Sequence, residues 1–166
     1  MKQREIHGIG LAIVGVFGLT LLSDNVFGQQ KTLKEQLIGT WTPVSISEVY
    51  PDGKKDTPWG PNLTGAFHFD PDGKVMVVII GADLANPSPM PQESKRQVVA
   101  YFGTYAVDEA AHTVTYTAQR ATIPAFDGLA RKATVTVNGD EMTQQSAPVT
   151  GPKGAFVPNL VLKRAK

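Results

Sequence analysis

The segment Leu37-Ile38-Gly39-Thr40-Trp41 constrains the fold more strongly than any other part of the chain. It joins a short amphipathic lead-in, marked by Leu33 and Leu37, to the first extended run. On the first strand of a small closed β-barrel, a large indole can fill the barrel base. A glycine two residues earlier lets a neighbouring backbone approach closely. The segment therefore predicts a β-barrel with Trp41 buried near its base.

The rest of the chain alternates short extended runs with turns, which is the pattern of a sandwich or a barrel. The dipeptides Asp52-Gly53, Asp72-Gly73 and Asn138-Gly139 tolerate the positive φ angles that tight hairpins require. Eight strands are predicted: Thr40–Tyr50, Gly65–Phe69, Val75–Ile80, Thr104–Asp108, Thr113–Arg120, Arg131–Val137, Glu141–Ser146 and Asn159–Arg164. Since about eight antiparallel strands close around packed side chains or one small ligand, we expect an all-β, eight-stranded antiparallel up-and-down barrel.

The interval after the third predicted strand has a different pattern. Gly81–Pro91 is rich in proline and is predicted to be a loop. Gln92–Phe102 then places Val98, Val99 and Phe102 on one helical face, which favours one short helix; a strand is the alternative for its C-terminal half. A helix this short needs an apolar surface to rest on. We therefore hypothesise that the loop and helix form a lid over the barrel mouth and gate ligand entry.

The first 28 residues have the features of a signal peptide. Lys2 and Arg4 form a basic start, and Ile9–Leu22 carries no charged residue. Small or apolar residues lead to an expected cleavage near Gly28 and Gln29. The sequence thus predicts a signal peptide over residues 1–28 and one barrel domain over residues 29–166. The expected location is periplasmic or secreted, without stable membrane insertion after cleavage.

Composition narrows the function classes. The net charge of +1 gives no electrostatic reason to expect nucleic-acid binding. The chain has no cysteine, and His68 and His112 of the mature domain lack the neighbours of a recognisable metal site. Serines without a nucleophile-elbow motif and glycines without a phosphate-binding motif leave nucleophilic catalysis and nucleotide binding unsupported. We expect no catalytic constellation, no metal and no cofactor.

Four motifs along the mature chain resemble those of the bacterial lipocalin-like domain family. They are Leu37-Ile38-Gly39-Thr40-Trp41, Pro58-Trp59-Gly60-Pro61 with Gly65, Asp70-Pro71-Asp72-Gly73 and Tyr101-Phe102-Gly103-Thr104-Tyr105-Ala106-Val107-Asp108. The resemblance runs from about Leu33 to Arg164. It implies an exported, small up-and-down barrel with a helix after the third strand.

The resemblance also implies specific roles. In the lipocalin pattern a basic side chain lies over the tryptophan at the barrel base, and here Arg164 or Lys163 is the candidate. The family often has histidine in the strand after the Tyr-x-Gly-x-Tyr motif, where this chain has Tyr116 and Thr117. A role that depends on those histidines therefore does not transfer. Fold resemblance by itself does not transfer an activity either.

The candidate ligand-binding residues lie on predicted strands and loops that would come together in the barrel or above its mouth. They are Trp59, Phe67, Tyr101, Tyr105, Tyr116 and Arg120. Tyrosine suits such a site because it combines an apolar ring with one hydroxyl that can orient a ligand. Phe126 is a further aromatic candidate, and Arg131 joins Arg120 as a polar contact for an anionic ligand group. The alternative is that the rings simply fill a small barrel.

These observations favour a binder or carrier of a small hydrophobic molecule. The first alternative is a barrel enzyme of the cyclase, isomerase or hydratase type acting on an apolar substrate, since positioning and one proton donor can suffice for such reactions. The second alternative is a structural module with a filled barrel.

Overall fold

The computed structural model describes residues 31–81, 97–151 and 153–166. The strands of the barrel are β1 (Gly39–Val49), β3 (Thr64–Phe69), β4 (Lys74–Ile80), β5 (Val98–Asp108), β6 (Thr113–Ala121), β7 (Ala130–Asn138), β8 (Glu141–Ser146) and β10 (Gly154–Arg164). The shorter elements are α1 (Leu33–Leu37), β2 (Lys55–Asp56), η2 (Pro124–Phe126) and β9 (Val149–Gly151). Within the described ranges, no helix is both long and apolar enough to span a bilayer.

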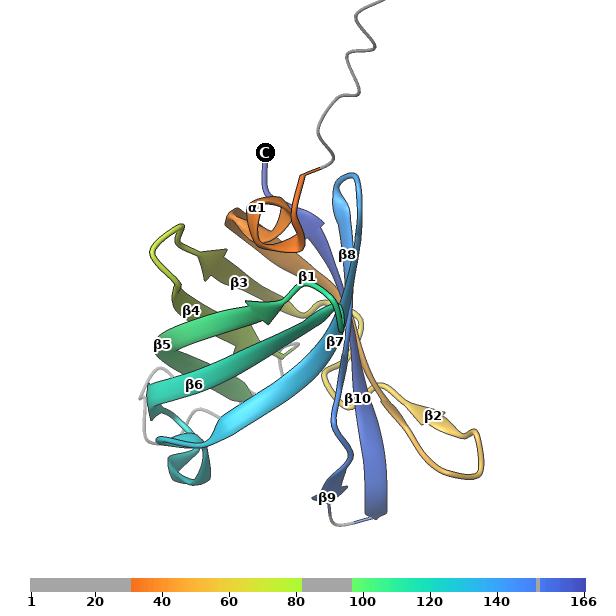
Figure 1. The fold of residues 1–166 in the computed structure, drawn as a ribbon. Helices are drawn as coiled ribbons and strands as arrows, with labels where there is room; N and C mark the ends of the chain where they lie inside the picture. Colours follow the sequence, from red (N-terminus) through yellow and green to blue (C-terminus); the bar gives the residue numbers. More distant parts are fainter. Residues whose placement is uncertain (1–30, 82–96, 152) are drawn as a thin grey trace, which may run out of the picture.

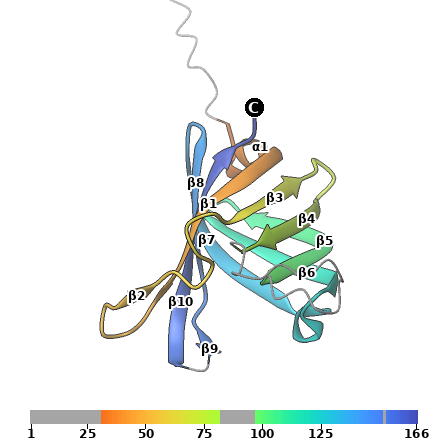
Figure 2. The ribbon, with the colours of Figure 1, turned by 180° about the vertical axis from the view of Figure 1, so that it is seen from behind.

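The eight long strands form one closed antiparallel sheet. Each pairs with the next in the order β1, β3, β4, β5, β6, β7, β8, β10, and pairing of β1 with β10 closes the barrel. The short strands β2 and β9 pair with the ends of β1 and β10 that lie away from α1, as both ribbon views show (Figures 1 and 2). The predicted eight-stranded antiparallel barrel is confirmed.

The predicted hairpin turns are also observed. Gly73, between β3 and β4, has a φ of +82°, and Gly139, between β7 and β8, has a φ of +59°. Both angles lie in the left-handed region, which glycine adopts at no steric cost. The turn residues therefore position four of the barrel strands through local chemistry alone.

The helix expected over Gln92–Phe102 is wrong for its described part. Val98 to Phe102 belong to β5 and pair with β4, from Ile80 opposite Val98 to Met76 opposite Phe102. The backbone groups of β4 offer these residues hydrogen-bond partners along their whole length. The β-branched Val98 and Val99 and the aromatic residues after them suit a strand better than a short helix. Residues 92–96, and nearly all of the predicted loop and lid, lie outside the described residues. Among the residues that are described, the one α-helix is α1, which precedes the first strand.

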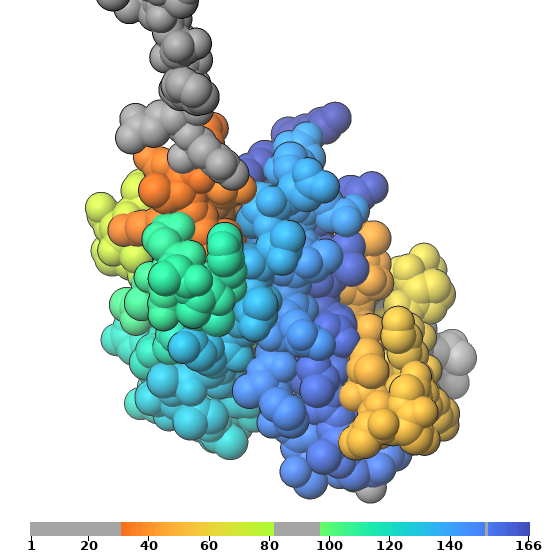
Figure 3. Space-filling view, turned by 45° about the vertical axis from the view of Figure 1, so that its right-hand side comes forward, coloured from red at the N-terminus to blue at the C-terminus, as the bar shows by residue number. Residues whose placement is uncertain are grey.

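Helix α1 covers one end of the barrel. Thr32 and Glu35 form a capping box at its start, and the Glu109 carboxylate accepts hydrogen bonds from the backbone N–H groups of Leu33 (2.7 Å) and Lys34 (3.0 Å). The turn that carries Glu109 lies directly against α1 in the space-filling view (Figure 3). With Leu33 and Leu37 buried, a five-residue helix that would not persist alone is held by tertiary contacts.

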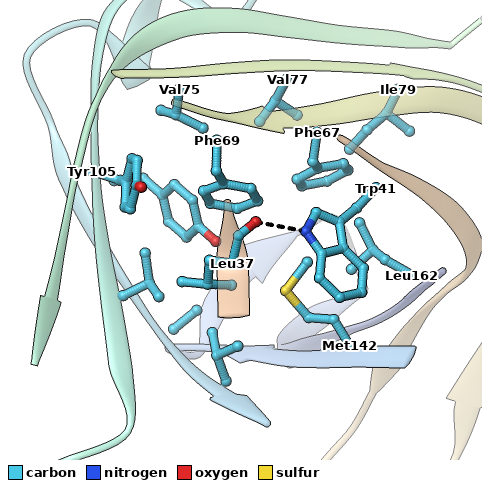
Figure 4. Close-up of a cluster of buried hydrophobic side chains, with 14 of the residues drawn as sticks. Leu37, Trp41, Phe67, Phe69, Val75, Val77, Ile79, Tyr105, Met142 and Leu162 are labelled. Atoms are coloured by element: carbon cyan, nitrogen blue, oxygen red, sulfur yellow. Dashed lines mark hydrogen bonds between the residues drawn. The ribbon is translucent and has the colours of Figure 1, made fainter. Parts of the chain in front are cut away.

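Trp41 lies beneath this helix, fully buried as predicted. Its Nε1 donates a hydrogen bond of 2.7 Å to the Leu37 carbonyl, and Phe67, Met142 and Leu162 surround its ring (Figure 4). The bond satisfies the one polar atom of the indole, so its large apolar surface can be buried without an unpaired donor.

Candidate ligand site inside the barrel

Four of the six candidate ligand-binding residues face the barrel interior. Phe67 on β3, Tyr101 and Tyr105 on β5 and Tyr116 on β6 are all buried in the core. Their strand alternation directs them inward, as period-two patterning requires. A fifth, Trp59, lies between β2 and β3, where it is partly buried and packs against the same core.

The sixth candidate, Arg120, lies apart from this group. Val114, Tyr116 and Ala118 point inward, so strict alternation would send Arg120 inward too. Instead, the pairing of β5 with β6 shifts between Phe102 and Gly103, and Gln119 becomes an extra residue. Because of this bulge, the residues of β6 after Gln119 point to the opposite face of the sheet from the one that strict alternation predicts.

Arg120 is consequently on the outer face. Its side chain is 77% exposed, and its Nη1 donates to Asp127 Oδ2 at 2.8 Å. The same carboxylate accepts a bond from the backbone N–H of Ala121, so Asp127 ties the segment after β6 to the end of that strand. Arg120 therefore serves a surface contact, and the structure brings a different arginine to the interior.

The rings nearest to α1 form a packed base. Phe69 meets Tyr105 edge to face, with ring centroids 5.1 Å apart, and Tyr116 at 6.1 Å. The Tyr105 hydroxyl donates to the Asp70 carbonyl at 2.8 Å, and Figure 4 shows Tyr105 beside Phe69. Since its polar atom already has a partner, Tyr105 belongs to the structural base of the barrel.

Tyr116 differs from Tyr105 because its hydroxyl has no partner. The residue is only 4% exposed, and its oxygen has no hydrogen bond of suitable distance and angle among the described residues, although the Gln144 side chain lies close enough to act on it. Burial, followed by the neighbouring Tyr101, raises the pKa of Tyr116 well above the ordinary tyrosine value, while the nearby Gln144 amide and Arg131 act in the opposite direction. The hydroxyl is therefore a protonated donor in a dry environment.

Arg131 lies opposite Tyr116, on β7. Its guanidinium carbon is 4.5 Å from the ring centroid of Tyr101 and 4.0 Å from that of Phe126, so two aromatic rings contact it. Its Nε and Nη2 atoms are buried and have no hydrogen-bond partner within the described part of the chain. Arg131 thus brings a confined positive charge to the interior beside Tyr116.

Gln144 is an interior polar residue that the sequence analysis did not single out. It lies on β8, is 4% exposed, and its amide nitrogen is 3.5 Å from the Met142 sulfur. Strand alternation would have predicted this position, because Gln144 lies two residues after the core residue Met142 and therefore on the same face of the strand. Gln144, Tyr116 and Arg131 are the polar groups of the interior that this site can use.

A separate hollow of about 890 Å³ lies on the outer face of β3 to β6. Its lining includes His68, Met76 and Phe102, and Met76 remains 57% exposed. His68 shares a 2.9 Å hydrogen bond with Thr40 through Nδ1. In the residues that the structure describes, no three histidine, aspartate or glutamate side chains gather as metal ligands would.

These features define a class: a small closed antiparallel β-barrel with one helix-covered end, where an arginine stacks on a buried tryptophan. The model of the lipocalin-like domain family matches residues 38–155. The chain belongs to this family. A comparison with curated proteins gives no match.

Proposed function

We propose that this protein binds a small, mainly hydrophobic molecule inside its barrel. The observation that carries the proposal is the Tyr116 hydroxyl, a buried donor without a hydrogen-bond partner in the part of the chain that the structure describes. An unpaired buried polar group is costly, so a core built for stability alone would place phenylalanine there. A ligand with one polar group would satisfy the donor while its apolar part contacts the rings.

The test uses the neutral fluorescent probe N-phenyl-1-naphthylamine, whose emission rises in an apolar site. Ala121 is half-buried and packs against the core opposite Tyr101, so Ala121→Phe adds bulk at the interior. We expect the wild-type protein to bind the probe and Ala121→Phe to weaken binding about tenfold.

Phe102→Ser is the matched control on the outer face, since Phe102 is exposed beside the outer hollow. It should leave probe binding unchanged. Loss of binding in Phe102→Ser with none in Ala121→Phe would place the probe in the outer hollow and contradict the proposal. No binding by any form would favour a structural module with a filled barrel.

We also propose that the protein is exported to the periplasm or secreted. The support is the basic start at Lys2 and Arg4, the uncharged apolar run that follows, and the small residues ahead of Gln29. N-terminal sequencing after expression in a Gram-negative host should give Gln29 or a neighbouring residue. An intact Met1 on membrane-bound protein would contradict the proposal.

A further inference from the structure

We propose that the ligand carries a carboxylate, which the Nε and Nη2 atoms of Arg131 bind as a pair while the Tyr116 hydroxyl donates a third hydrogen bond. This inference rests on the proposed function, because it names the chemistry of the molecule held at the same site.

The first argument is the geometry of the unpaired atoms. Nε and Nη2 of Arg131 share one edge of the planar guanidinium, and both are buried without partners in the described residues. Their N–H groups point in the same direction, at the spacing of the two oxygens of a carboxylate. The rings of Tyr101 and Phe126 both contact the guanidinium and restrict its rotation. The Nε and Nη2 edge of the Arg131 guanidinium is therefore already oriented before a ligand binds.

The second argument is charge. Arg120 and Arg164 each contact a carboxylate of the chain, at 2.8 Å from Asp127 and 3.6 Å from Asp140. No such contact joins Arg131 to an acidic side chain of the described residues. Arg131 is partly buried, and its Nε and Nη2 atoms are shielded from solvent. Shielding a cation without a counter-charge is costly, and two aromatic faces compensate for only part of that cost. A ligand carboxylate supplies the missing charge, whereas a hydroxyl or ester supplies none.

The third argument is the position of Tyr116. It lies directly opposite Arg131 in the register of β6 and β7, which brings the two side chains to the same face of the sheet. Its buried hydroxyl stays protonated at neutral pH and can donate to an anion held by the guanidinium. Both orphan groups are thus satisfied by one carboxylate.

The experiment compares two competitors that differ in charge, octanoate and 1-octanol, by displacement of bound N-phenyl-1-naphthylamine. On the wild-type protein, we expect octanoate to bind about tenfold or more tightly than 1-octanol. Arg131→Met should remove this preference and change the affinity for 1-octanol by less than about twofold. Arg131→Lys, which keeps the charge but not the fork, should retain part of the preference.

Arg120→Met is the matched control, because it removes an arginine from the outer face and should leave both affinities unchanged. Equal binding of the two competitors to wild-type protein would overturn the inference but leave the proposed function standing. An equal loss of both affinities in Arg131→Met would also overturn it, since that result indicates a structural role. If the probe and both competitors fail to bind, the proposed function itself fails.

Discussion

The Arg164 guanidinium stacks on the Trp41 indole, with its central carbon 4.1 Å from the ring centroid. The two residues are paired across β1 and β10, where the barrel closes. Arg164 also donates hydrogen bonds to two backbone carbonyls at the end of α1. One is that of Gln36 (2.7 Å), in the last turn of the helix, and the other is that of Ile38 (3.0 Å), the residue that follows the helix. One side chain therefore joins the closing strand, the buried indole and the helix that covers the base. Of the two basic candidates, Arg164 and not Lys163 takes this position.

Replacing Arg164 with alanine should lower the free energy of unfolding by about 2–4 kcal/mol, because a cation–π contact and two charged hydrogen bonds are lost together. Urea denaturation followed by tryptophan fluorescence measures the change. Lys163→Ala is the matched control on the exposed side of the same strand and should change stability by less than about 0.5 kcal/mol. Equal effects of the two variants would show that the stacking is incidental.

Trp41→Ala should cost about 3–5 kcal/mol, since it removes a fully buried indole and leaves a cavity under α1. Trp41→Phe should cost less, because a ring still fills part of the site. Chemical denaturation followed by circular dichroism suits these variants, as they lose a fluorophore. A loss below about 1 kcal/mol in Trp41→Ala would be inconsistent with an indole that fills the barrel base.

Gly103→Ala should destabilise the protein by about 3 kcal/mol or more, because the bulge brings strand β6 unusually close. A Cβ atom at this position would lie 2.0 Å from the Thr117 carbonyl oxygen and 3.0 Å from the Ala118 Cα atom. A Cβ atom at Gly139 would meet no atom of the described residues within 4 Å, so Gly139→Ala has only the strain of its positive φ and about 1 kcal/mol is expected. Thermal unfolding of both variants separates steric conflict from backbone strain.

Tyr116→Phe should leave the stability of the unliganded protein unchanged or raise it by about 1 kcal/mol, because the substitution removes a buried hydroxyl that has no partner among the described residues. The same variant should bind octanoate more weakly. Denaturation and probe displacement on one preparation test both effects. A clear loss of stability would mean that the hydroxyl has a structural partner, and the argument for a ligand would lose its main support.

The ion pair between Asp56 and Lys153 should give stability a specific pH dependence. A 2.8 Å hydrogen bond from Lys153, together with its charge, holds the pKa of Asp56 below the ordinary value. Because the pKa is lower in the folded state, the stabilisation is present above the unfolded-state pKa and is lost as the pH falls through the folded one.

The difference in Tm between wild type and Asp56→Asn should therefore be present at neutral pH and vanish in acid. Carbon-detected NMR titration of the Asp56 carboxyl should show its pKa rising toward the ordinary value in Lys153→Ala. Lys54→Ala is the control, since Lys54 is 3.9 Å from the other carboxylate oxygen and should have a smaller effect. Equal effects of the two lysines would contradict the assignment.

Local chemistry in the sequence determined most of the architecture. The Asn138-Gly139 turn and the alternation of Val114, Tyr116 and Ala118 depend only on neighbouring residues, so they predicted hairpins and facing correctly. The same alternation brought Phe67, Tyr101 and Tyr105 into the interior. The large indole of Trp41, at the start of the first strand, likewise predicted a buried side chain at the barrel base from the sequence alone.

Tertiary structure alone decided the features that depend on a neighbouring strand. Pairing with β4 made Val98 to Phe102 a strand, although their spacing also fits a helix. The bulge at Gln119 turned Arg120 outward, which no pattern within β6 indicates, because a bulge is a mismatch between two strands. Only barrel closure brought Arg164 onto Trp41, 123 positions apart in the numbering. The contacts of the Arg131 guanidinium with rings from β5 and η2 likewise arise because distant segments meet in the folded chain.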